Sequence, residues 1–213
     1  DQQRLKNHFP DGRVFAKEER DDRVLLHLDE HDLHHCKEFR EANVFGERLV
    51  DTSVLAKSEM VINMDTDCLT FAPLEELHSV VAAGEVAHIQ DPQAHPFSIT
   101  DEEAKRRFGV VPAPHFNAGL CAFPRERFDL GRIENWLSAP GYPMDTHYAE
   151  QTILAALAAL GPSCALPQSR YTFGTRHDDA AFVHYADHYL SETRISMRRD
   201  GQKQILHQLA AQS

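Results

Sequence analysis

The 213-residue chain is predicted to fold as one α/β domain over residues 1–213, with a mostly parallel central sheet flanked by helices. Two observations lead to this fold class. Short β-rich apolar runs alternate along the chain with longer amphipathic segments. The apolar runs are bounded by helices, which is typical of buried parallel strands.

Composition limits the classes of function. Hydrophobic residues make up 42% of the chain and charged residues 26%, as in ordinary globular proteins. The net charge is −11 with neutral histidines, so the basic surface that nucleic acids and anionic membranes require is missing. No apolar run reaches the roughly 18–20 residues of a membrane span. We therefore expect no nucleic-acid partner and no membrane span.

The cysteine pattern indicates the compartment. The four cysteines form no CxxC pair, and their density is too low for a disulfide scaffold. Three of them, Cys68, Cys121 and Cys164, lie in apolar surroundings and are predicted to be buried and reduced. A reducing, cytoplasmic location is the expectation.

The first 64 residues are predicted to contain two short strands and two helices. The strands are placed over 13–16 and 23–28, and the helices over 30–41 and 46–58. A buried strand, Met60-Val61-Ile62-Asn63-Met64, then ends abruptly in acidic residues.

The rest of the chain continues the alternation. The next strand is predicted over 85–89, followed by a loop-rich stretch with a helix near 100–108. The strongest helix covers 146–160, with Asp145 as its N-cap and Gly161-Pro162 as its stop. A late strand over 182–185 and a polar closing helix complete the order.

An acidic triplet follows the buried strand directly. Asp65 and Asp67 flank Thr66, and on an extended backbone residues i and i+2 point the same way. Both carboxylates can therefore reach one ion at the carboxyl end of a parallel strand, where open α/β sheets bind ligands. A hard divalent cation held by two carboxylates fills its other positions with water and phosphate oxygens. Such a cation would let an acidic protein bind a diphosphate.

The flanks of this triplet carry a family resemblance. The segment VINMDTDCLTFAPLEEL resembles the metal-binding segment of nucleotide-sugar glycosyltransferases of the GT-A fold, especially glycosyltransferase family 8. Further similar segments follow in the family's order: EVAHIQDP at 85–92, HFNAGL at 115–120, Glu150-Gln151, and Val183-His184-Tyr185. The resemblance covers about residues 46–190, and the order and spacing of these short motifs carry it.

The resemblance implies a set of roles. Asp65, Asp67 and His184 would bind manganese (Mn²⁺) or magnesium (Mg²⁺), and Thr66 and Gly119 would join the two aspartates in binding the donor. Three residues would serve catalysis at the reacting sugar: Asn117, Glu150 and Gln151. The implied activity is metal-dependent hexosyl transfer from a nucleotide diphosphate donor, a UDP-sugar, to an unidentified glycan, lipid or protein acceptor.

Structural alternatives exist for the same residues. Aspartates after a strand are often solvated, and a histidine in a late apolar strand is often a hydrogen-bonded core residue. Glu150 complements a helix dipole in the first turn, and Gln151 can cap or pack there. Only 64 residues precede Asp65, and none of them forms a first β-turn-α nucleotide unit. The nucleotide-binding part is therefore expected to be abbreviated or missing.

Two rival functions remain open. A haloacid-dehalogenase-like phosphatase also has a hydrophobic strand ending in Asp-x-Asp, and Asp178-Asp179 imitates its late acidic motif. That family has Thr or Val where Leu69 stands. The other rival is a sugar-nucleotide-binding domain without turnover, which metal-dependent donor binding without transfer would reveal.

Overall fold

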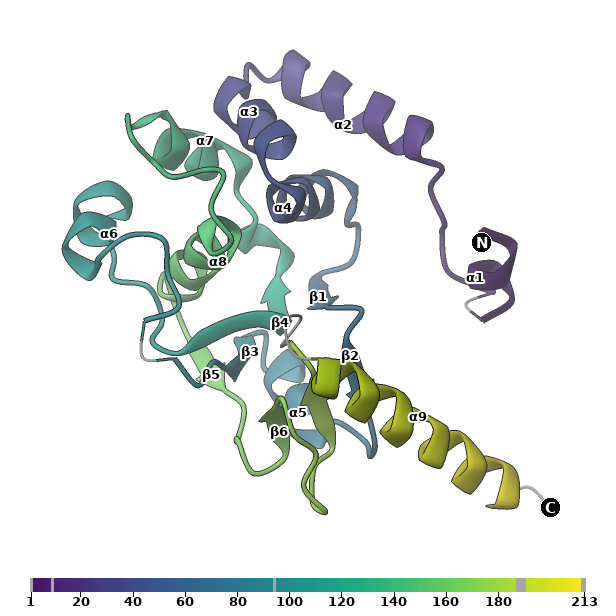
Figure 1. Ribbon diagram of the computed structural model, residues 1–213. Coiled ribbons are helices and arrows are strands. Elements are labelled where there is room, and N and C mark those ends of the chain that lie inside the picture. The colour runs from purple at the N-terminus through teal and green to yellow at the C-terminus, as the bar shows by residue number, and fades with distance from the viewer. Residues whose placement is uncertain (1, 9, 94, 187–190, 212–213) are drawn as a thin grey trace. The chain divides into compact units, whose positions relative to one another are not determined.

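The computed structural model describes residues 2–8, 10–93, 95–186 and 191–211 (Figure 1). The chain divides into two compact units. One comprises Asp1–Ala56 and Asp129–Thr146, and the other comprises Lys57–Phe128 and His147–Ser213. Every site residue predicted from the sequence belongs to the second unit.

The described part of the first unit is helical. Its elements are α1 (Gln2–His8), α2 (Lys17–Glu30), α3 (His34–Ala42), α4 (Val44–Leu55) and α7 (Leu130–Ser138). The helices predicted over 30–41 and 46–58 are confirmed as α3 and α4. Described residues before Met60 form no strand.

The prediction of two strands near the N-terminus is wrong. Residues 13–16 have no regular structure, and 23–28 lie inside α2. The apolar run Val24 to Leu28 is short enough for a strand, but its two ends are four residues apart and are the buried positions of the helix. Leu26 between them is 59% exposed, which a helix permits because that position lies on the opposite face.

The second unit contains the sheets. Its strands are β1 (Met60–Met64), β2 (Cys68–Thr70), β3 (Val86–Gln90), β4 (Phe116–Pro124), β5 (Ser163–Ala165), β6 (Tyr171–Phe173) and β7 (Phe182–His184). Its helices are α5 (Glu75–Ala82), α6 (Asp101–Phe108), the 3₁₀ turn η1 (Arg125–Arg127), α8 (Ala149–Ala158) and α9 (Ser191–Ala211). The predicted strands at 60–64, 85–89 and 182–185 are confirmed, as are the helices at 100–108, 146–160 and the closing helix.

The larger sheet is mixed and contains one antiparallel strand that was not predicted. Its strand order is β1-β4-β3-β5, in which β4 pairs antiparallel with both β1 and β3, and β3 pairs parallel with β5. Strands β1, β3 and β5 thus run one way and β4 runs the other way between β1 and β3. The sequence did not predict the antiparallel strand β4, whose small residues have low strand propensity.

The smaller sheet has the order β2-β7-β6. Strand β2 pairs antiparallel with β7, and β6 pairs parallel with β7. Tyr185, directly after β7, donates its phenol proton to Asp200 of α9 at 2.9 Å. Burial and the neighbouring carboxylate raise the pKa of the Tyr185 hydroxyl, so it remains a neutral donor that ties β7 to this helix.

The core of the second unit lies around β4. All nine residues of β4 are buried, and so are all ten residues of α8, which contacts it. The alanines of α8 permit this close packing on every side. The other sheet face carries Ile89 and Leu120, which cluster with Leu77 of α5. Figure 1 shows α8 above β4 and α5 below it.

Two finer predictions have different outcomes. Tyr148, not Asp145, is the N-cap of α8, and its side chain makes no capping hydrogen bond. Cys68 and Cys121 are buried free thiols as predicted, whereas Cys164 is partly exposed. Among the described residues, no helix combines the length and apolar character that crossing a membrane requires.

Candidate metal centre and active site

Antiparallel pairing of β1 with β4 brings the acidic triplet to the HFNAGL segment. Met64, the last residue of β1, lies opposite Leu120. The ladder continues one step further, since the Asp65 N–H donates to the Gly119 carbonyl at 2.9 Å. Asp65 therefore meets the start of β4 because β4 runs against β1, and not because parallel strands end at a common edge.

A second antiparallel pair brings in the late histidine. Cys68 of β2 lies opposite His184 of β7, and the Tyr185 N–H donates to the Asp67 carbonyl at 2.9 Å. The backbone on both sides of the triplet is thus fixed by ladder hydrogen bonds. Residues about 120 positions apart in the sequence meet at this point.

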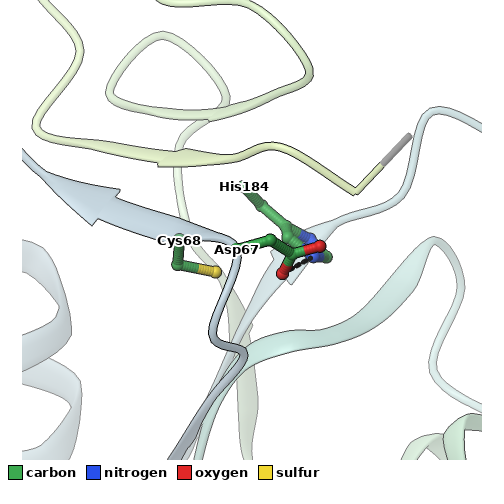
Figure 2. A group of neighbouring side chains, drawn as sticks. All are labelled: Asp67, Cys68 and His184. Atoms are coloured by element: carbon green, nitrogen blue, oxygen red, sulfur yellow. Dashed lines mark ion pairs between the residues drawn. The ribbon is translucent and has the colours of Figure 1, made fainter. Parts of the chain in front are cut away.

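The side chains of these segments converge on one point. His184 Nε2 lies 3.3 Å from an Asp67 carboxylate oxygen and 3.6 Å from an Asp65 carboxylate oxygen. Figure 2 shows the Asp67 carboxylate against the imidazole ring, with Cys68 to one side. The histidine is only 3% exposed, whereas the Asp65 and Asp67 side chains retain 24% and 19% exposure. The carboxylates can therefore meet an ion that arrives from solvent.

The imidazole is held on its other edge. His184 Nδ1 lies 3.0 Å from Oδ1 of Asn117, and the Gly119 N–H donates to the same oxygen at 2.9 Å. The ring also lies directly over Gly119, where a Cβ would sit 2.2 Å from Nδ1. Phe173 contacts the ring edge-on at 5.2 Å between centroids. These contacts leave Nε2 directed at the carboxylates.

This donor set fits a hard divalent cation. Nε2 of His184 is buried and makes no hydrogen bond within the described part of the chain, which is the state a metal-binding nitrogen requires. One imidazole and two carboxylates suit Mn²⁺ and Mg²⁺. A thiol is also near, because ligand atoms of Asp67, Cys68 and His184 lie within 4.8 Å of one another. Cys68 directs its sulfur to the Gly119 carbonyl at 3.4 Å, so its proton already has an acceptor.

The residues predicted to face the reacting sugar are mostly buried. Gln151 is 7% exposed; its Oε1 accepts from the Ala118 N–H at 3.0 Å and its Nε2 donates to the Pro96 carbonyl at 2.9 Å. Glu150 is 2% exposed in the first turn of α8. Thr66 is exposed between the two aspartates. Gln151 thus lies against the HFNAGL segment, and Asn117 lies beside His184.

Sequence reasoning missed two features of this site. Asp91, which directly follows β3, is 3% exposed and accepts a hydrogen bond from Asn117 Nδ2 at 2.8 Å. The only signal for Asp91 in the sequence is an acidic residue close to the end of a predicted strand. Gly119 is predicted to bind the donor, and the contact of its Cα with the His184 ring was not predicted.

Known structures share this arrangement of elements. The galactosyltransferase LgtC, solved with donor and acceptor sugar analogues, matches with a TM-score of 0.50 and 18% identity over 74% of this chain. The chain spans 65% of the length of LgtC. An active-site mutant of LgtC matches with a TM-score of 0.43 and 17% identity over 73% of this chain and 65% of its own.

Comparison by sequence does not detect this structural similarity. No protein-family model matches the chain, and no curated protein does so either. The structural neighbours are GT-A glycosyltransferases. The chain therefore has the GT-A-like α/β fold that its motifs predict, with a mixed sheet flanked by helices.

Proposed function

We propose that this chain is a metal-dependent glycosyltransferase that moves a sugar from a nucleotide diphosphate donor, a UDP-sugar, to a glycan, lipid or protein acceptor. One observation carries the proposal. The buried Nε2 of His184 lies 3.3 Å from an Asp67 carboxylate oxygen and 3.6 Å from an Asp65 carboxylate oxygen, on a GT-A-like fold. Fold alone does not specify chemistry, so this group of side chains is the support for the activity.

Asp65, Asp67 and His184 would hold the ion. A bound divalent cation supplies Lewis-acid chemistry, which neutralises the charge that develops on the leaving diphosphate. An imidazole ligand favours Mn²⁺ over Mg²⁺, because magnesium prefers oxygen ligands and retains its waters. The partial exposure of the two aspartates leaves room for a phosphate-bearing ligand on the solvent side.

The other residues would bind and orient the sugar. Gln151 is held by Ala118 and Pro96, so its amide has one defined direction beside β4. We assign Gln151 and Glu150 to contact with the reacting sugar, and Thr66 and Gly119 to binding of the donor. Asn117 keeps one N–H beyond its bond to Asp91, and this N–H can donate to a sugar hydroxyl. Fixed donors of this kind lower a barrier by positioning and by electrostatic stabilisation.

The test is release of UDP from a panel of UDP-sugars by the purified chain with Mn²⁺, with and without saccharide acceptors. We expect turnover with at least one donor, and a loss of about 100-fold or more in Asp65→Asn and Asp67→Asn. Circular dichroism should show an unchanged fold in both variants.

An exposed aspartate of the same unit provides the matched control. Asp179→Asn should retain turnover, because this side chain is exposed and outside the ligand group. Hydrolysis of phosphate esters that depends on Asp179 would contradict the proposal and favour the phosphatase. Metal-dependent UDP binding without turnover on any acceptor would favour the non-catalytic binding domain.

A further inference from the structure

We infer that Asp91 and Asn117 are positioning residues that fix the ring proton of His184 on Nδ1 and so leave Nε2 for the metal. The inference deepens the proposed function and rests on its metal site. Its evidence is a directed series of hydrogen bonds in which each group can play only one role. The series begins at Asp91, passes through Asn117 and ends at the edge of the imidazole.

Asp91 sets the direction of the series. Its carboxylate is buried, with one oxygen accepting from the Gln93 N–H at 2.9 Å and the other accepting from Asn117 Nδ2 at 2.8 Å. An amide nitrogen can only donate, and a carboxylate oxygen that faces it accepts. The amide of Asn117 must therefore present its NH₂ group to Asp91.

The orientation of the Asn117 amide determines which hydrogen bond it makes with His184. Its Oδ1 lies on the far side from Asp91, where it accepts from the Gly119 backbone N–H at 2.9 Å. A backbone N–H only donates, so Gly119 and Asp91 independently require the same amide orientation. Oδ1 lies 3.0 Å from His184 Nδ1 and can only accept. Nδ1 must then carry a proton.

The consequence lies at the other ring nitrogen. A neutral imidazole has a single N–H, so a proton on Nδ1 leaves the lone pair on Nε2. Nε2 is the atom that lies 3.3 Å from Asp67. Metal-binding histidines generally donate their second ring N–H to a fixed acceptor, which sets both tautomer and ring direction. Asn117 Oδ1 accepts two hydrogen bonds, from Gly119 and from His184, so both of its acceptor sites are occupied. The oxygen of Asn117 therefore acts by orienting the histidine.

The first experiment locates the proton directly. Long-range ¹H–¹⁵N spectra of the ¹⁵N-histidine-labelled full chain, without metal and at a pH where the ring is neutral, distinguish the two tautomers. We expect the His184 proton on Nδ1. A ring with its proton on Nε2 would overturn the inference, whatever the activity of the protein.

The second experiment measures Mn²⁺ affinity without nucleotide, from the electron paramagnetic resonance signal of free manganese. Asn117→Leu is similar in size but has no acceptor, and should weaken Mn²⁺ binding about 10- to 100-fold. The double variant Asn117→Asp with Asp91→Asn reverses the polarity of the first bond and keeps the acceptor for His184. Its affinity for Mn²⁺ should stay within about threefold of the wild-type affinity. This difference is smaller than the loss expected for Asn117→Leu.

Controls separate positioning from general damage. Thr172→Val removes another buried hydrogen bond of the same unit, from Thr172 to the Phe182 carbonyl, and should leave Mn²⁺ affinity unchanged. Binding by the double variant as weak as that of Asn117→Leu would overturn the inference. If wild type binds no Mn²⁺ but its proton lies on Nδ1, the proposed function fails and the assignment of the proton stands.

Discussion

Gly119 shows how one missing side chain sets the position of a candidate ligand. A Cβ at this position would lie 2.2 Å from both Nδ1 and Cε1 of His184, closer than atoms can approach. The ring therefore occupies the space that any other residue would fill. The same glycine donates its N–H to Asn117, and its carbonyl accepts from the Asp65 N–H.

Gly119→Ala should displace the His184 ring and lower Mn²⁺ affinity by about 10-fold or more, since the loss of ligand orientation has this magnitude. Manganese titration followed by electron paramagnetic resonance measures the effect. Gly201→Ala is the matched control, because its new Cβ meets only Leu69 at an ordinary 3.5 Å. Wild-type affinity in Gly119→Ala would show that the ring position is not needed.

Cys68 provides a second residue-scale test, on the identity of the ion. A thiolate ligand would favour a softer metal such as zinc, whereas carboxylates and imidazole suit manganese. Cys68→Ser keeps a donor for the Gly119 carbonyl, so Mn²⁺ affinity should remain at the wild-type level. His184→Ala, by contrast, should weaken it severalfold or more. Equal losses in the two variants would make Cys68 a ligand.

At the scale of elements, β4 explains why the site forms. It is the strand that β1 and β3 share, and its first residues carry Asn117 and Gly119. Sequence motifs predicted a function for these residues but did not predict the strand, because Phe116–Pro124 is rich in small residues and lies in a loop-rich stretch. The confirmed strands, β1, β3 and β7, contain branched or aromatic residues in compact runs.

The order of motifs was therefore predictable, and their contacts were not. Asp65, Asp67 and His184 could be named from the sequence as one group, and they do converge. Asp91 could not be named, since its role depends on an antiparallel register that places Ile89 opposite Asn117. Helix α2 was missed because a window starting at Arg23 excludes the charged helix-forming residues that begin at Lys17.

Helix α3 of the first unit gives a prediction on stability. Its N-terminus has no side-chain cap of its own; instead Glu134 of α7 accepts from the backbone N–H groups of His35 and Cys36 at 2.9 and 2.8 Å. Burial alone would raise the pKa of Glu134, but these hydrogen bonds outweigh it and lower the pKa below its ordinary value of 4.5. The bonded form in the folded state is thus the charged one.

A carboxyl group with a lowered folded-state pKa stabilises above its unfolded pKa and loses that effect as pH falls through the folded value. The contribution of Glu134 should be complete above about pH 4.5 and disappear below it. Glu134→Gln should lower the free energy of unfolding by about 0.5–2 kcal/mol at pH 7, the range for lost helix caps. Urea unfolding from pH 3 to 7 checks this, and a variant with an unchanged pH dependence would contradict it.

At the scale of the whole molecule, charge makes a cation necessary for the proposed donor. The chain carries a net charge of −11, and the site adds two carboxylates where a diphosphate would bind. Like charges repel and slow association, so a nucleoside diphosphate should not bind this surface without a positive ion. The charge of the chain thus supports the proposed metal dependence, as the candidate ligand group does.

Calorimetric titration of the full chain with UDP, in Mn²⁺ and in EDTA, is the decisive test of a metal-dependent donor site. We expect binding in Mn²⁺ only, lost in Asp67→Asn and retained in the exposed control Asp179→Asn. UDP binding that persists in EDTA, or that survives in Asp67→Asn, would contradict it.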